Sequence, residues 1–111
     1  MVVVDADNGR VVASLPIGRG SDAVAFDPSH KRVFSSNGMD GTVSVYQQSS
    51  ADKYVLADLI TTQVSARTMD LDPKSGRLFV AASDPAPGLP ANGRPKMTPG
   101  SLKLLIFDPK N

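Results

Sequence analysis

The sequence contains no cysteine, no glutamate, no tryptophan and only one histidine. Without cysteine, the chain has no disulfide, no thiolate metal site and no cysteine nucleophile. The single histidine also excludes a metal site built from several imidazoles. All eleven acidic residues are aspartates, which together with nine glycines and nine prolines favour turns over helices. The composition therefore predicts a turn-rich, all-β chain.

A strong charge of one sign and a long hydrophobic run are also missing. Twelve cationic and eleven anionic side chains leave a formal charge of +1, which indicates neither a strongly basic nucleic-acid binder nor an acidic disordered tail. No apolar run approaches the roughly 18 residues of a membrane span, and Asp5 follows Met1 too soon for a signal peptide. We therefore expect one small domain without a membrane partner.

The most informative pattern is an internal repeat. Residues 26–34 return as residues 71–79, shifted by about 45 positions, and each copy carries an Asp-Pro turn, Asp27-Pro28 and Asp72-Pro73. Aspartate bonds the backbone ahead of it and proline presets φ at the next position, so both pairs predict type I turns. The equivalent positions of the two aspartates favour turn capping over a catalytic acid pair.

The alternation of apolar and polar residues predicts nine strands. Asn8-Gly9 predicts a tight hairpin between the first two, because both residues accept positive φ. Val24 and Phe26 share one face of the third strand with alanines opposite, which predicts packing on both faces. The segment 47–53 is polar and is expected to be a loop. The expected strands are residues 2–5, 10–15, 23–26, 32–36, 42–46, 54–60, 67–71, 77–81 and 101–107.

Four strands occupy one repeat, and this divides the chain into three units. Residues 1–18 hold the last two strands of a partial unit, and residues 19–62 hold one complete four-stranded unit. Residues 63–111 hold three strands of a further unit, with a proline-rich loop at 83–100. That loop replaces the short turn at residues 37–41, which ends on Gly41 in the complete unit.

Three segments of the complete unit resemble the YVTN-type, YncE-like β-propeller repeat proteins. They are Ala25-Phe26-Asp27-Pro28, then Val33-Phe34-Ser35-Ser36-Asn37 at the tyrosine-valine-threonine-asparagine position, then Asp40-Gly41-Thr42-Val43-Ser44-Val45. The second copy departs from this pattern, because Phe79-Val80-Ala81-Ala82 lacks the asparagine. The resemblance implies a partial β-propeller of four-stranded antiparallel blades, and a periplasmic or extracellular protein.

A ring of this family holds about seven blades, whereas this chain matches about two and a quarter. We therefore expect it to be the C-terminal part of a larger propeller. An open ring leaves strand edges and blade faces uncovered. The expected partners are other blades of the same propeller or further copies of the chain, joined through open edge strands, and a protein or small-molecule ligand.

Loops entering the first strand of each unit, and those joining its second and third strands, are expected at one end of the ring. Their charged and polar residues, with two cations of the 83–100 loop, form a candidate surface for an anion or a phosphate backbone. Ordinary solvated loop charges are the alternative explanation. The candidate residues are Arg19, Asp22, Asn37, Asp40, Arg67, Arg94 and Lys96.

Other patterns in the sequence are weaker evidence of function. Residues 18–23 fit a GxGxxA dinucleotide fingerprint, but that fingerprint requires a helix, and Pro28 follows alternating strand residues instead. Residues 5–9 resemble the start of a calcium loop without its closing glutamate, so a hairpin turn explains them better. His30 is predicted to be a solvated turn residue, and no serine lies in a Gly-x-Ser-x-Gly elbow. No cofactor is expected.

These observations favour a non-enzymatic scaffold or binding module. One alternative is a fragment of a propeller hydrolase or lactonase with a central metal held by aspartates and asparagines, for which blades outside this chain supply further ligands. The other is a propeller that binds single-stranded nucleic acid, for which two tyrosines and four phenylalanines offer few stacking platforms.

Overall fold

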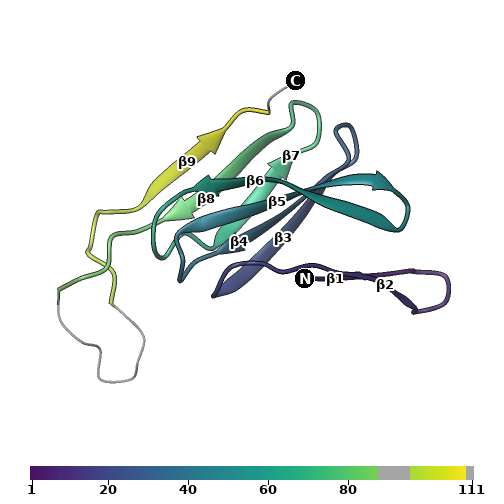
Figure 1. Cartoon of the computed structure of the whole chain (residues 1–111). Coiled ribbons are helices and arrows are strands. Elements are labelled where there is room, and N and C mark those ends of the chain that lie inside the picture. The colour runs from purple at the N-terminus through teal and green to yellow at the C-terminus, as the bar shows by residue number, and fades with distance from the viewer. Residues whose placement is uncertain (88–95, 110–111) are drawn as a thin grey trace.

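The structure, a computed structural model, describes residues 1–87 and 96–109 and consists of antiparallel β-strands (Figure 1). The described residues form no helix, so none of them makes a helix able to cross a membrane. The prediction of an all-β chain is therefore confirmed. The strands are β1 (Val2–Val4), β2 (Val11–Ser14), β3 (Ser21–Asp27), β4 (Arg32–Asn37), β5 (Thr42–Ser50), β6 (Lys53–Thr61), β7 (Thr68–Asp72), β8 (Arg77–Ala82) and β9 (Lys103–Phe107).

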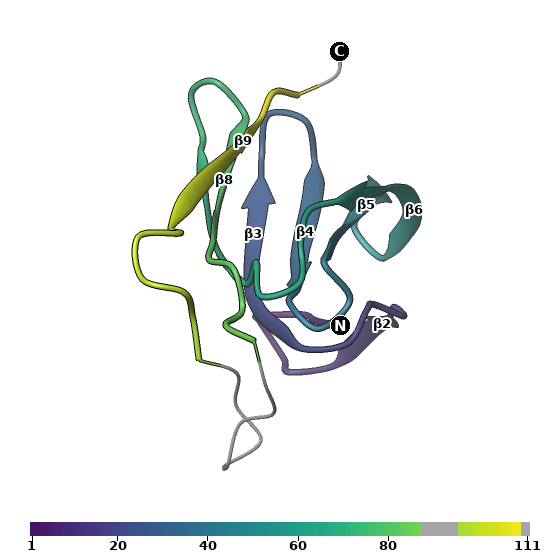
Figure 2. The same cartoon turned by 90° about the vertical axis from the view of Figure 1, so that its left-hand side faces the viewer.

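The strands form three antiparallel sheets, and within each sheet the neighbouring strands follow one another in sequence. β1 and β2 form a hairpin, β3-β4-β5-β6 form a four-stranded sheet, and β7-β8-β9 form a three-stranded sheet. Each of the nine strands expected from the sequence is present. Figure 2 shows β8 and β9 on one side of β3 and β4, with β5 and β6 on the other.

The predicted loop at residues 47–53 was wrong. β5 continues through Gln47 and Gln48 to Ser50, and β6 starts at Lys53, so only two residues connect them. The polar side chains are satisfied inside the sheet, because Gln47 donates from Nε2 to the carbonyl oxygens of His30 and Lys31. Cross-strand pairing therefore outweighs the low strand propensity of these residues.

The β1–β2 hairpin forms where it was predicted, but its turn is larger than the expected two residues. It runs from Asp5 to Arg10, and the Asp5 amide donates to the Arg10 carbonyl over 2.8 Å. Gly9 has a φ of 74°, whereas Asn8 does not adopt positive φ. Asn8 instead accepts the Arg10 amide at its side-chain oxygen, while Asp5 accepts the Asp7 amide. The polar side chains thus organise a wider turn than Asn-Gly alone predicts.

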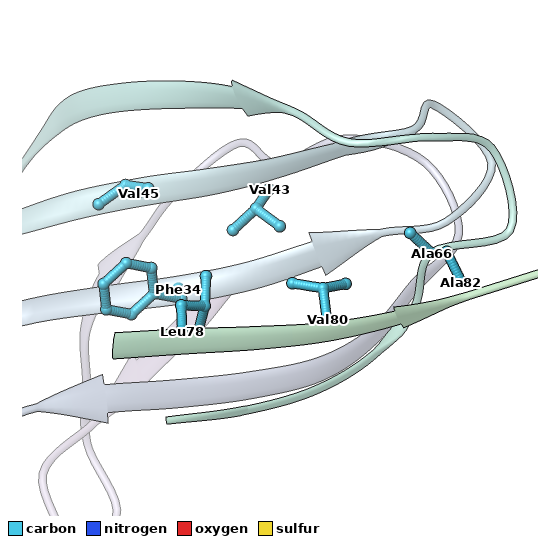
Figure 3. Packing of buried hydrophobic residues seen from close by; sticks show 7 residues of the cluster. All are labelled: Phe34, Val43, Val45, Ala66, Leu78, Val80 and Ala82. Carbon is cyan, nitrogen blue, oxygen red and sulfur yellow. The ribbon is translucent and has the colours of Figure 1, made fainter. Parts of the chain in front are cut away.

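The core lies between the four-stranded and the three-stranded sheet. Side chains from β4 and β5 face side chains from β8, and Figure 3 shows them gathered between the sheets. Such face-to-face burial of aliphatic side chains is the main source of stability in a chain of this size. The cluster comprises Phe34, Val43, Val45, Ala66, Leu78, Val80 and Ala82.

β3 is covered on one face only, contrary to the expectation of packing on both. Ala25 packs against the core cluster, whereas Val24 and Phe26 on the opposite face are exposed. The alternation of the strand is present, but on its second face Val24 and Phe26 line an open groove whose other side is formed by β1.

At the end of the sheets where β3 turns into β4, the buried Asp27 organises the turn. Its Oδ1 accepts the Ser29 amide over 2.9 Å, and its Oδ2 lies 2.7 Å from Nδ1 of His30. Burial alone raises the pKa of Asp27, but the bonds from the His30 side chain and from the two turn amides outweigh it and lower the pKa below its usual value. His30 in turn lies over Gly76 of the equivalent β7–β8 turn.

Replacing Asp27 with alanine is expected to reduce the free energy of unfolding by about 1–3 kcal/mol, because the turn amides of Ser29 and His30 lose their buried acceptor. Because the pKa of Asp27 is lower in the folded than in the unfolded chain, its contribution is complete above the unfolded value near 3.8 and falls as the pH drops below it. Urea unfolding across that range checks this. Asp72→Ala is the control and should cost less, because Asp72 lies at the equivalent turn but is only half-buried. Equal losses would contradict the role of burial.

The two turns differ at one backbone position. Lys31 has a φ of 53°, and Gly76, which lies 45 positions later, has a φ of 73°. A residue with a Cβ loses roughly 1–2 kcal/mol of stability when it adopts positive φ. Glycine avoids this cost, but it loses more backbone entropy on folding, so the net advantage of glycine is smaller.

We therefore expect Lys31→Gly to raise the free energy of unfolding by about 0.5–1 kcal/mol. Gly76→Ala should lower the free energy of unfolding, because the alanine would have to adopt positive φ and its Cβ would lie 3.1 Å from Cε1 of His30. Denaturant titration of both variants measures the difference. Changes of the same sign would show that φ does not control these turns.

Candidate binding surface at the loop end of the sheets

Opposite the Asp27 turn, three loops meet at what we call the loop end. It comprises residues 15–20 before β3, residues 38–41 between β4 and β5, and residues 62–67 between β6 and β7. Backbone bonds hold them together: the Gly38 amide donates to Gly20 over 2.9 Å, and the Ser65 amide donates to Gly38 over 2.8 Å. Loops from the four-stranded sheet are thereby joined to the loop that leads into the three-stranded sheet.

The glycines of the GxGxxA segment have a packing role here. A Cβ on Gly20, whose φ is 71°, would lie 2.7 Å from the Met39 amide nitrogen, and one on Gly18 would lie 2.8 Å from the Asn37 side chain. β3, rather than a helix, begins directly after Gly20. The glycines therefore allow two loops to approach closely, and the segment lacks the helix that a dinucleotide site requires.

Arg19 and Asp40, two of the candidate residues, bind each other. Nε of Arg19 donates to Oδ1 of Asp40 over 2.8 Å, and the Arg19 amide donates to Oδ2 over 2.9 Å. The Arg19 amide and then its guanidinium lower the pKa of Asp40. Asp40 is ionised at neutral pH, so the pair has no net charge and offers little attraction to an anion.

Asn37 lies at the end of β4 and is fully buried, so its side chain does not contribute to the exposed surface expected from the sequence. Its Nδ2 donates to Oγ of Ser44 over 2.9 Å and to Oγ1 of Thr42 over 3.1 Å. Its Oδ1 accepts a bond of 3.3 Å from Ser35. The asparagine of the repeat motif therefore links β4 to β5 just where the turn begins.

The other candidates are spread over the surface. Asp22 is exposed at the start of β3, and Arg67 is exposed beside Gly38, where a Cβ would lie 3.0 Å from that of Arg67. Lys96 is exposed, and its carbonyl accepts the Ala86 amide. Arg94 lies outside the described residues. Of the cations predicted to gather, the structure places Arg19 and Arg67 on adjoining loops of the loop end.

The structure adds a polar cluster around Asp84 that the sequence did not reveal. Oδ1 of Asp84 accepts Nζ of Lys103 over 3.0 Å and Nε2 of Gln63 over 3.3 Å, and these donors lower its pKa, Lys103 most. Ser65 donates from its hydroxyl to the Ser83 carbonyl. These partners are about 20 residues apart without a recognisable motif, so only the folded chain brings them together.

The base of the 83–100 loop is ordered into a short antiparallel ladder. The Ala86 amide donates to Lys96 over 2.6 Å, and the Thr98 amide donates to Asp84 over 2.8 Å. Pro85 and Met97 form a bridge between the two arms. The part of this loop that the structure describes is therefore attached to the loop end through Asp84 and Ser83.

The three loops of the loop end contain no histidine. Within residues 1–87 and 96–109, no three histidine or aspartate side chains gather as ligands of a metal ion. His30 lies at the opposite end of the sheets, bonded to Asp27. None of the six aromatic residues belongs to the three loops of the loop end. Comparison with protein-family models, curated proteins and solved structures gives no significant match for this chain.

Asn37→Ala is expected to lower the free energy of unfolding by about 1–3 kcal/mol, because the buried hydroxyl groups of Ser35 and Ser44 and the half-buried one of Thr42 lose a partner. Asp22→Ala, a substitution at an exposed position of the same end, should change it by less than about 0.5 kcal/mol. Thermal or urea unfolding of the two variants gives the comparison. A neutral effect of Asn37→Ala would show that its bonds do not support the turn.

Proposed function

We propose that this chain is a non-enzymatic β-propeller segment that acts as a scaffold and presents a binding surface at its loop end. The three sheets are then successive four-stranded blades or parts of them, as the resemblance to YVTN-type repeats implies. The observation that supports this proposal is that the stabilising core and the exposed loops lie in separate parts of the chain. The apolar cluster between the sheets stabilises the fold, whereas exposed, hydrogen-bonded loops meet at one end.

Two features support the interpretation of the sheets as blades. Successive strands within a sheet pair antiparallel, and one sheet packs face to face on the next, as in propellers. The loops support the binding role. They are tied by backbone bonds to one another, which holds a surface in shape at little entropic cost when a ligand binds. Paired charges such as Arg19 and Asp40 suit a neutral or mixed polar ligand better than a polyanion.

A scaffold of this kind predicts that fold and surface respond separately to mutation. The double variant Arg19→Ala with Asp40→Ala should keep the free energy of unfolding within about 0.5 kcal/mol of the parent chain. Leu78→Ala should lower it by about 2–5 kcal/mol, because Leu78 is a fully buried member of the core cluster. Urea unfolding measures both, and a double variant as unstable as Leu78→Ala would contradict the division.

Two assays test the function directly. The chain should not hydrolyse lactone substrates in the presence of divalent cations, and a labelled single-stranded oligonucleotide should show no salt-sensitive binding. Turnover that follows the protein through purification, and disappears when His30 or Asp84 is replaced, would overturn the non-enzymatic assignment. Oligonucleotide binding that weakens steeply with salt would assign the chain to nucleic-acid binding instead.

A further inference from the structure

Two sheet faces of this molecule are apolar and uncovered. One, which we call the groove face, belongs to the four-stranded sheet and carries Val24, Phe26 and Val33. The other, which we call the outer face, belongs to the three-stranded sheet and carries Phe79, Leu104 and Ile106. Residues directly opposite one another in a ladder share a face, and the pairs Phe26–Val33 and Phe79–Ile106 define these two sides.

The outer face is the repeat equivalent of a face that is buried elsewhere in the same chain. Phe79 lies 45 positions after Phe34, and its cross-strand partner Ile106 corresponds to Val45, the partner of Phe34. Val45 is 4% exposed beneath the three-stranded sheet, whereas Ile106 is 53% exposed. The same side of two equivalent sheets is therefore buried in one and open in the other.

The groove face has the complementary relation. Val24, Phe26 and Val33 lie 45 positions before Met69, Leu71 and Leu78, which pack against the four-stranded sheet from the three-stranded one. Leu78 is 2% exposed, whereas Val24 is 68% and Phe26 is 48% exposed. Within one chain, the three-stranded sheet therefore uses its equivalent of the groove face to cover the four-stranded sheet. The side of the four-stranded sheet that it covers is the equivalent of the outer face.

We propose that the outer face of one copy of this chain binds the groove face of a second copy, in the arrangement that the two sheets already have within each copy. The contact is heterologous, since it joins two different faces, and repeated addition leads to a closed ring or an open filament. It buries exposed aliphatic and aromatic side chains that a monomer leaves in water. Repeat-equivalent residues supply the shape complementarity.

The groove gives the incoming sheet room beside β3. It has a volume of about 600 Å³, and β1 forms its far wall with Val2 and Val4. β1 corresponds to the third strand of a unit, which is also the place of β9, so the incoming β9 takes the position of β1 next to β2. The resulting order β7-β8-β9-β2 reproduces that of the complete sheet, β3-β4-β5-β6. β1 has only three residues to displace, whereas β9 has five.

Association through the two faces should be broken by a charge on either one. Ile106→Lys places an ammonium on the outer face, and Val24→Lys places one on the groove face. We expect the parent chain to self-associate with increasing concentration in sedimentation velocity. Each variant should be monomeric, with a dissociation constant raised at least about tenfold, because burial of an unpaired charge is costly.

The decisive sample is an equimolar mixture of the two variants. Val24→Lys retains an intact outer face and Ile106→Lys retains an intact groove face, so the mixture should form one-to-one dimers and nothing larger. Val64→Lys is the matched control. Val64 is 54% exposed in the loop between β6 and β7, away from both faces, and this variant should associate like the parent chain.

Circular dichroism and urea unfolding verify that the variants fold, and Leu104→Lys with Phe26→Lys form a second pair if either first variant does not. A parent chain that remains monomeric at its solubility limit would overturn the proposal. Self-association of Val24→Lys or Ile106→Lys alone would also overturn it, because the contact would then join like faces. Neither result would contradict the proposed function, since that function depends on the loop end. Lactone turnover or oligonucleotide binding would contradict the proposed function and would leave the self-association proposal unaffected.

Discussion

The structure depends on one contact, the packing of the three-stranded sheet on the four-stranded sheet. Leu78 and Val80 of β8 fill the space below Val43 and Val45 of β5, and each of the four is almost completely buried. A chain of 111 residues buries too little surface to tolerate the loss of this contact. The separation of the two sheets thereby fixes the positions of the loops that connect their strands.

The loop end follows from that packing. β3 lies beside β7, and the loops that lead into these two strands are both bonded to Gly38 of the loop between β4 and β5. The hydroxyl of Ser36 donates to the Arg67 carbonyl over 2.5 Å, which links the two units directly. The same packing brings the Asp27 turn against Gly76 at the opposite end. Both ends of the molecule are therefore held by contacts between the two units, and at the Asp27 end these contacts join repeat-equivalent turns.

Much of the strand pattern was predictable, whereas little of the candidate surface was. Alternation located all nine strands, but it missed that Gln47 and Gln48 continue β5, because polar residues inside a ladder give no apolar signal. Asn37 was assigned to an exposed loop, yet it is buried by bonds to Ser44 and Thr42 that no sequence pattern reveals. The ion pairs of Arg19 and Lys103 also join residues about 20 positions apart.

The sequence by itself determined the strands, the repeat of 45 positions and the Asp-Pro turns, because these depend on local preferences and on the period of side-chain burial. Only the tertiary structure decided which face of each strand is covered. Val24 and Met69 occupy equivalent positions with similar hydrophobicity, yet one is exposed and the other packs against the core. Burial depends on whether a second sheet is present, and no local pattern contains that information.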